Sequence, residues 1–397
     1  MLESKKMTIH NKIKSYIPEM ERWRHHIHQN PEIAYEEKKT SDFIAKKLNE
    51  FGLEVHLGFG KTGVVGVIHG KHKKTSNKSI GIRADIDALP MTERTNLKYS
   101  SKNQGKMHAC GHDGHTTMLL GAAKYLAETR NFFGAVYCIF QPAEEGGNAG
   151  AKSMINDGLF KKFNIDSVWG IHNWPGVPVG QAVIHQGFAM AGGDIIEITI
   201  EGKGGHAAQP QFSNDPIVSA GLTITALQTT ISRQLDPFDQ CVLSLTKVNG
   251  GSAFNVIPDK VTIGGTLRST NEITRGTMLK KIQECAENAC AINNCSMNLE
   301  IRPGYPSTIN DIKSADIASK IFEKTFGPHS LNKNEKPTMT SEDFSYMLLE
   351  KPGAYIWLGA GIDSKKLHSS FYDFNDKLLP IGAEYWVTLA ETILMEQ

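Results

Sequence analysis

The feature that most constrains the fold is an alternation of short apolar runs with a helix-like segment in the first half of the chain. Four strand-like runs occupy residues 63–68, 79–83, 135–140 and 167–171, and helical spacing of apolar residues extends from 115 to about 129. Strands that alternate with helices are typical of α/β folds, because parallel strands need long crossover connections. The pattern therefore predicts an α/β domain with a mixed, mostly parallel sheet flanked by helices.

The pattern of polar and apolar residues changes near residue 189. Residues 194–201 alternate polar and apolar side chains, as a half-exposed antiparallel strand does. From there the expected order is strand, helix, strand, strand, helix, strand, which is typical of a ferredoxin-like α+β sandwich. The C-terminal part returns to helices and buried strands. We therefore predict a main domain in two pieces, residues 1–188 and 304–397, interrupted by an inserted domain at 189–303.

Charge and hydropathy argue against nucleic-acid and membrane partners. The chain has 43 basic and 42 acidic residues, and its densest basic stretch, residues 71–74, resembles a solvated loop. No segment has the roughly 18 consecutive apolar residues that a membrane helix needs. The N-terminus has no apolar core of the kind found in secretory signals. We therefore expect a cytoplasmic protein that binds neither nucleic acid nor membrane.

Four polar clusters follow predicted strands or precede the predicted helix. They lie at residues 108–115, 141–146, 172–175 and 367–371. In open α/β sheets, ligands bind outside the carboxyl ends of the strands. We therefore expect these four segments to meet at one rim of the sheet.

The clusters contain the side chains that bind zinc and neighbouring transition metals, namely a thiol, imidazoles and a carboxylate. The candidate ligands are Cys110, His112, Glu145, His172 and His368. The six cysteines of the chain are too sparse and irregular for a disulfide framework, so Cys110 is interpreted as a ligand. Adjacent residues at a strand end diverge, so Glu145 can bind metal while Glu144 acts as general base. Any one of these residues alone would more often be an ordinary surface or core residue. The prediction rests on their occurring together at the strand ends.

These motifs, with others along the chain, resemble those of a known family. The matching stretches are residues 24–32, 83–90, the Cys110 loop, 141–146, 170–173, 202–208, 254–258 and 341–344. They are similar, in order and over nearly the whole chain, to the dinuclear-metal aminoacylase and carboxypeptidase family. The resemblance is to the amidohydrolase branch, which includes hippurate hydrolases, auxin-conjugate hydrolases and N-acetyl-diaminopimelate deacetylases.

The resemblance implies a zinc-exopeptidase-like catalytic domain with two divalent ions, Zn, Mn, Co or Ni, on the five candidate ligands. It implies that Glu144 is the general base and that Asp87 is a carboxylate next to the metal ligands. It further implies that the inserted domain acts as a lid and forms a homodimer, in which His206 of one subunit reaches the active site of the other.

The implied reaction is hydrolysis of an N-acyl amino acid to a free amino acid and a carboxylic acid. The amino-acid carboxylate needs a cation, and Arg268 near the end of an inserted-domain strand could bind it, with Asn255 adding a hydrogen bond. Both could equally be ordinary surface residues. An N-acetyl-diaminopimelate deacetylase or a dipeptidase would suit the same scaffold.

Two other classes remain as alternatives. A cysteine hydrolase would use Cys110 as nucleophile and His112 as base, although residues two apart in a glycine-flanked loop rarely hold that geometry. A non-catalytic metal-binding protein would not need Glu144, which is retained here.

Overall fold

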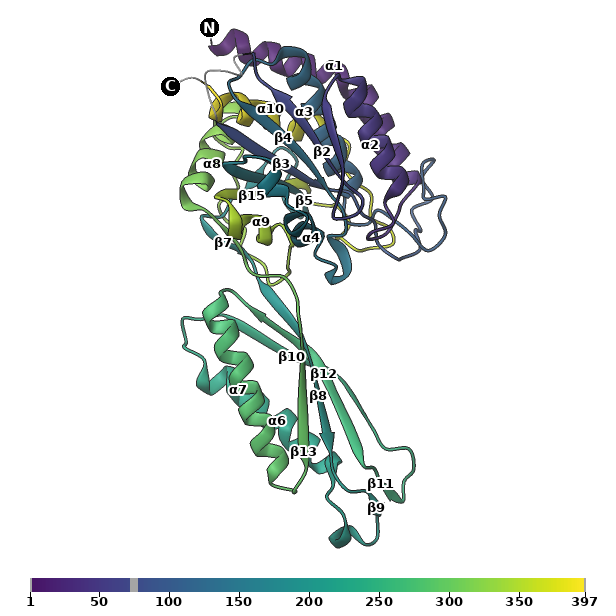
Figure 1. Cartoon of the computed structure of the whole chain (residues 1–397). Coiled ribbons are helices and arrows are strands. Elements are labelled where there is room, and N and C mark those ends of the chain that lie inside the picture. The colour runs from purple at the N-terminus through teal and green to yellow at the C-terminus, as the bar shows by residue number, and fades with distance from the viewer. Residues whose placement is uncertain (1, 72–77, 396–397) are drawn as a thin grey trace. The chain divides into compact units, whose positions relative to one another are not determined.

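The computed structural model describes residues 2–71 and 78–395, so that only Lys71 of the basic stretch at 71–74 is among the described residues. The chain divides into two compact units (Figure 1). The first comprises Met1–Ala189, Ile309–Pro337 and Asp343–Gln397, and the second comprises Met190–Thr308 and Thr338–Glu342. The segment 338–342, which the sequence pattern leaves in the C-terminal piece, joins the second unit because Thr338 bridges to Met190 and Ser341 bonds to Arg268.

The first unit is built on a seven-stranded mixed sheet with the strand order β1-β2-β4-β3-β5-β15-β6. Its four central strands, β4, β3, β5 and β15, are parallel, and the outer ladders are antiparallel. This confirms the predicted fold class. The strands are β1 (Glu54–Phe59), β2 (Gly63–His69), β3 (Ser79–Asp85), β4 (Ala135–Gln141), β5 (Ser167–Pro175), β6 (Ala182–Val183) and β15 (Gly353–Gly361).

Helices flank this sheet, and α1, α3 and α10 pack against one another (Figure 1). Because α3 also contacts the sheet, nearly all of its side chains are buried. No helix within residues 2–71 and 78–395 combines the length and apolar character that crossing a membrane requires. The helices are α1 (Leu2–Gln29), α2 (Lys38–Glu50), α3 (His112–Thr129), α4 (Gly150–Asn156), α5 (Leu159–Lys162), α8 (Ile312–Phe326), α9 (Ser345–Glu350) and α10 (Leu378–Ile393), with a 3₁₀ turn η1 (Glu145–Gly147).

Helix α3 begins at His112, three residues earlier than the periodicity predicts. The preceding Gly111 has a left-handed backbone with φ of 100°. A Cβ atom at Gly111 would lie 2.0 Å from Asn173 Oδ1, so only glycine fits there. The turn thus brings the backbone close to β5 and makes His112 the first residue of the helix.

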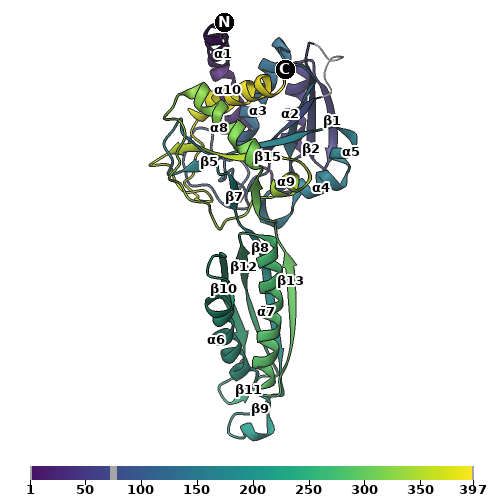
Figure 2. The ribbon, with the colours of Figure 1, turned by 90° about the vertical axis from the view of Figure 1, so that its left-hand side faces the viewer.

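The second unit contains a four-stranded antiparallel sheet in the order β10-β12-β8-β13, with α6 and α7 side by side on one face (Figure 2). The observed element order is the predicted one. The apolar positions of β8 are buried as the alternation predicts, with Ile196, Ile198 and Ile200 in the core. The elements are β8 (Gly192–Glu201), α6 (Pro216–Gln234), β10 (Cys241–Gly250), β12 (Lys260–Ser269), α7 (Glu272–Ala291) and β13 (Ser296–Pro303).

Shorter elements complete the chain. Two pairs of residues, β9 (Gly205–His206) and β11 (Val256–Ile257), form a small antiparallel ladder in the second unit, next to the 3₁₀ turn η2 (Pro210–Phe212). The strands β7 (Gly187–Met190) and β14 (Thr308–Asn310) span two of the four boundaries between the units along the chain.

Candidate metal centre

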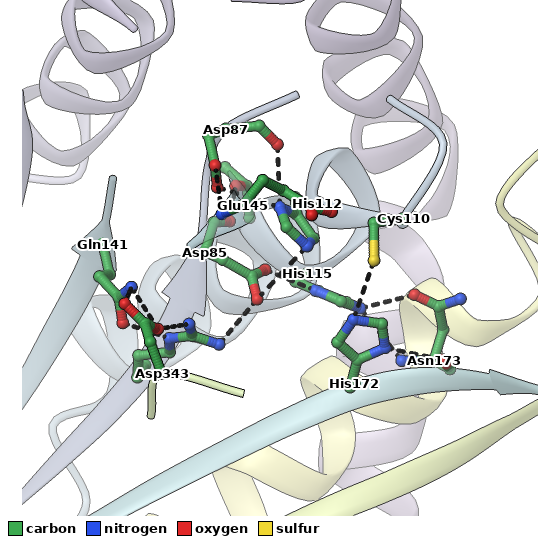
Figure 3. Close-up of polar contacts among 12 residues, drawn as sticks. Asp85, Asp87, Cys110, His112, His115, Gln141, Glu145, His172, Asn173 and Asp343 are labelled. Carbon is green, nitrogen blue, oxygen red and sulfur yellow. Dashed lines mark hydrogen bonds and ion pairs between the residues drawn. The ribbon is translucent and has the colours of Figure 1, made fainter. Parts of the chain in front are cut away.

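The five predicted ligands approach one another in the first unit, at the rim predicted from the strand ends. Figure 3 shows Cys110, His112, Glu145 and His172. Cys110 Sγ lies 3.4 Å from His172 Nε2, and His368 Nε2 lies 3.2 Å from Glu145 Oε1. Ligand atoms of Cys110, Glu145 and His368 lie within 4.8 Å of one another. Four of the five are buried and His368 is exposed. His172 lies inside β5, which continues to Pro175, rather than after a strand ending at residue 171.

Both buried imidazoles are oriented by backbone carbonyls. His112 Nδ1 donates to the carbonyl oxygen of Asp87 at 2.8 Å, and His172 Nδ1 donates to that of Asn173 at 2.8 Å. In each ring the other nitrogen, Nε2, is thereby turned toward the centre. A metal-binding histidine is usually held in this way by its second nitrogen.

The residues present fit a bound cation. His112 Nε2 is buried and has no hydrogen-bond partner, which is costly for a polar atom unless something binds it. Burial, and then the negative charges of Glu145 and Glu144, raise the pKa of the Cys110 thiol well above its ordinary value. A thiolate at this position therefore needs a nearby cation, which a metal ion would supply.

The electrostatics of the cluster also argue against a cysteine nucleophile. Burial, and then the neighbouring His115, lower the pKa of His172 well below its ordinary value. Because the pKa of the Cys110 thiol is also raised, the thiolate that a cysteine hydrolase needs is disfavoured whether His112 or His172 is its partner.

Asp87 connects two of the candidate ligands. Its backbone carbonyl and its Oδ1, at 3.2 Å, both accept from His112, while its Oδ2 accepts from the backbone N–H of Glu145 at 2.9 Å. Burial alone would disfavour the charged imidazole, but the carboxylates of Asp85 and Asp87 raise the pKa of His112 to about 10. Glu144 is buried beside this pair, with a carboxylate oxygen within 4.8 Å of ligand atoms of His112 and Glu145.

Three residues behind the ligands were given no role from the sequence: Asp85, His115 and Asn173. His115 donates through Nδ1 to Asp85 at 2.6 Å, and its Nε2 lies 2.7 Å from Asn173 Oδ1 (Figure 3). Asn173 in turn donates to the buried hydroxyl of Tyr372 at 2.6 Å. The sequence carries a signal for two of them: Asp85 is the last residue of β3, and His115 is three residues from His112 on one helix face.

Asp85 is completely buried, and Arg83 links it to the segment that follows the second unit. Arg83 bonds to Asp85 at 2.7 Å and to Asp343 at 3.0 Å. Gln141 also donates to Asp343, at 2.8 Å. Although burial opposes ionisation, the charges of His112 and Arg83 hold the pKa of Asp85 well below its ordinary value. These contacts tie the ends of β3 and β4 together beneath the candidate ligands.

A second buried network adjoins the start of α3. His28 is fully buried, with Nδ1 2.8 Å from Asp113 and Nε2 3.3 Å from Glu93. Burial alone would lower its pKa, but the hydrogen bonds to Asp113 and Glu93 raise the pKa of His28 to about 9. Since the ordinary value is 6.5, the network contributes stability that is complete below pH 6.5 and is lost as the pH rises through 9.

Replacement of His28 by Asn should therefore remove a pH-dependent part of the stability. We expect the wild type to lose about 3 kcal/mol more than H28N between pH 6 and pH 9.5, because each pKa unit corresponds to about 1.4 kcal/mol. Urea unfolding of the metal-loaded proteins at both pH values measures this difference. The exposed His329 provides the control, because H329N should follow the wild type. If the free energy of unfolding falls equally in H28N and in the wild type between the two pH values, the prediction is wrong.

The other predicted site residues belong to the second unit. His206 and Asn255 are exposed and adjacent, since Ala207 N donates to Asn255 O at 3.0 Å and His206 pairs with Val256. Arg268 is half-buried near the opposite end of β12, where it bonds to Ser341. Lys260, at the other end of β12, follows Asp259, whose Oδ1 accepts from the backbone N–H of Gly204, close to His206 in the chain, at 2.7 Å. Arg268 lies eight positions further along the strand, which corresponds to about 26 Å. The structure thus brings His206 and Asn255 together and places Arg268 apart from them.

The fold and the ligand set define the class of protein as a metal-dependent hydrolase. The model of peptidase family M20/M25/M40 matches residues 81–392. The chain belongs to this family, as the motif resemblance predicts, and it acts as a metal-dependent hydrolase of amide bonds.

Similar proteins agree with this assignment. The chain is 45% identical to a hippurate hydrolase of Campylobacter jejuni, over 94% of this chain and 96% of that protein. It is 40% identical to the IAA-amino acid hydrolase ILR1-like 2 of Arabidopsis thaliana, over 96% and 87% of the two chains. The crystal structure of Bacillus subtilis YXEP protein, a dinuclear metal binding peptidase from the M20 family, matches with a TM-score of 0.84 and 32% identity, covering 96% of this chain and 99% of that one.

Proposed function

We propose that this chain hydrolyses N-acyl amino acids of the hippurate or N-acetyl type, releasing a free amino acid and a carboxylic acid. The observation that carries the proposal is the convergence of Cys110, His112, Glu145, His172 and His368 in overlapping clusters of possible metal ligands, with the buried Nε2 of His112 lacking a hydrogen-bond partner. The hippurate hydrolase and IAA-amino acid hydrolase among its relatives support this substrate class.

The five ligands would hold two divalent ions, a number supported by the dinuclear YXEP structure. Zn, Mn, Co and Ni all suit the mixed thiolate, imidazole and carboxylate set. When bound, the ions would polarise the amide carbonyl and acidify water. Asp87 would orient His112 and the Glu145 backbone through the hydrogen bonds described above.

Glu144 would act as general base. Its carboxylate would accept a proton from the attacking water and then deliver that proton to the leaving nitrogen. Its position next to Glu145 in the chain supports this division of roles, because one carboxylate can face the ions while the other faces the reacting water.

His206 would stabilise the developing oxyanion in the active site of a partner subunit. This is supported by the length of β12, because about 26 Å of strand lies between Arg268 and the end of β12 next to the His206 segment, more than a small substrate spans. Arg268 would bind the amino-acid carboxylate through its guanidinium, and Asn255, next to His206, would add a hydrogen bond.

The inserted domain would form the homodimer and act as a lid. Its edge strand β10 exposes Val242 and Val248, and the first half of α6 exposes Ile217, Val218 and Leu222. An edge strand with apolar side chains is a ready surface for pairing with a second copy. We further propose a cytoplasmic location for the enzyme.

Removal of metal should abolish hydrolysis. We expect chelator-treated protein to release no amino acid from benzoyl-glycine, N-acetyl amino acids, N-acetyl-diaminopimelate or dipeptides, and one of the four metals to restore activity. The assay measures free amino acid after each addition. Activity that survives chelation would contradict the proposal, and so would failure of every metal with every substrate.

A further inference from the structure

Aromatic residues that are not themselves candidate ligands lie beside His172. His172 and Trp174 are two apart on β5, so their side chains share one face of the sheet. The parallel register places Trp357 of β15 opposite His172. The three rings therefore belong to one surface at the end of β5, and the Trp174 ring centre lies 6.2 Å from that of His172.

Trp174 is held rigidly on one side. Its indole stacks on that of Trp357 with ring centres 3.9 Å apart and planes 4° from parallel. Trp357 is itself buried and is fixed edge to face by His185 at 4.8 Å. Stacking on a buried, immobile ring fixes the position of Trp174 at little further cost in side-chain entropy.

Trp174 is nevertheless only half-buried, whereas Trp357 is 1% exposed. Part of the indole thus stays accessible next to a candidate metal ligand. The orientation of His172 has a separate support, because the backbone carbonyl of Asn173 accepts a hydrogen bond from its second ring nitrogen. A pre-positioned and partly open indole at this point is suited to contact a substrate.

We propose that Trp174 is a specificity-determining residue that binds the acyl group and favours aromatic acyl groups over acetyl. This rests on the proposed function, in which the scissile carbonyl lies at the ligand cluster. The ring of a benzoyl group is bonded directly to that carbonyl, so it must lie close to the cluster. An indole offers such a ring an offset or edge-to-face contact, and acetyl has no ring to use it.

The test compares benzoyl-glycine with acetyl-glycine in the metal-loaded enzyme. We expect W174L to lower kcat/KM for benzoyl-glycine about 10-fold and to change the value for acetyl-glycine less than about 3-fold. W174F should retain most of the preference. The control is F160L, which removes a half-buried ring on α5 and should change neither value.

Binding of the acyl product gives a second measurement that does not require turnover. W174L should weaken binding of benzoate about 10-fold relative to acetate, as measured by calorimetry. Equal losses for both acyl groups would overturn the inference, because Trp174 would then only support His172. A loss that follows the amino-acid side chain, tested with benzoyl-phenylalanine, would also overturn it. If the wild type hydrolyses neither substrate, the proposed function fails, and the benzoate comparison still decides the role of Trp174.

Discussion

Replacement of Glu144 by glutamine should lower kcat about 1,000-fold while leaving metal binding intact. Glutamine preserves the size of the side chain but cannot accept a proton from water, and general-base catalysis typically contributes 10²–10⁴-fold. Glu144 is 7% exposed, but because glutamine has nearly the same shape the substitution leaves no large cavity. The measurement is kcat on the best substrate of the panel, together with the metal content of the purified protein.

Glu145 is the matched control for this experiment. It is adjacent in the chain, similarly buried at 9% exposure, and lies 3.2 Å from His368. E145Q should lose metal affinity as well as activity, because it removes a charged ligand. Near-normal turnover in E144Q, or loss of metal from E144Q, would show that Glu144 is not the base.

Replacement of Arg24 by methionine should lower the free energy of unfolding of the metal-loaded protein by about 3–5 kcal/mol. Arg24 is fully buried and forms ion pairs with Asp373 at 2.8 Å, Asp376 at 2.7 Å and Asp113 at 3.4 Å. Removing one partner of a buried ion-pair network leaves charges unpaired in a medium that solvates them poorly. Urea unfolding at neutral pH measures the loss.

Arg22 supplies the control on the same helix. It is two residues away in α1 and is exposed, so R22M should change the free energy of unfolding by less than about 0.5 kcal/mol. Similar losses in R24M and R22M would mean that the network around Arg24 contributes no more than an exposed arginine does. The result also bears on the catalytic site, since Asp113 follows the candidate ligand His112 in α3.

The sequence alone was sufficient for the fold class and the identity of the family, and it named candidate ligands that the structure brings together. Apolar runs and helical spacing are local patterns that predict strands and helices. In an α/β sheet the carboxyl ends of the parallel strands lie along one rim. Cys110, Glu145, His172 and His368 could therefore be expected to meet before any distance was known. Local periodicity was less informative about where elements begin, as the start of α3 at His112 illustrates.

Only the tertiary structure decided which residues support the ligands. Arg24 meets Asp376 across about 350 positions of sequence, and Trp174 meets Trp357 only because β5 and β15 are neighbours in parallel register. Likewise, the chain of contacts from Asp85 through His115 to Asn173 depends on the close approach of α3 to β5 at Gly111. Local sequence patterns indicate whether a residue is buried. Which residue it contacts depends on strand order and register, and these are set by packing of the whole domain.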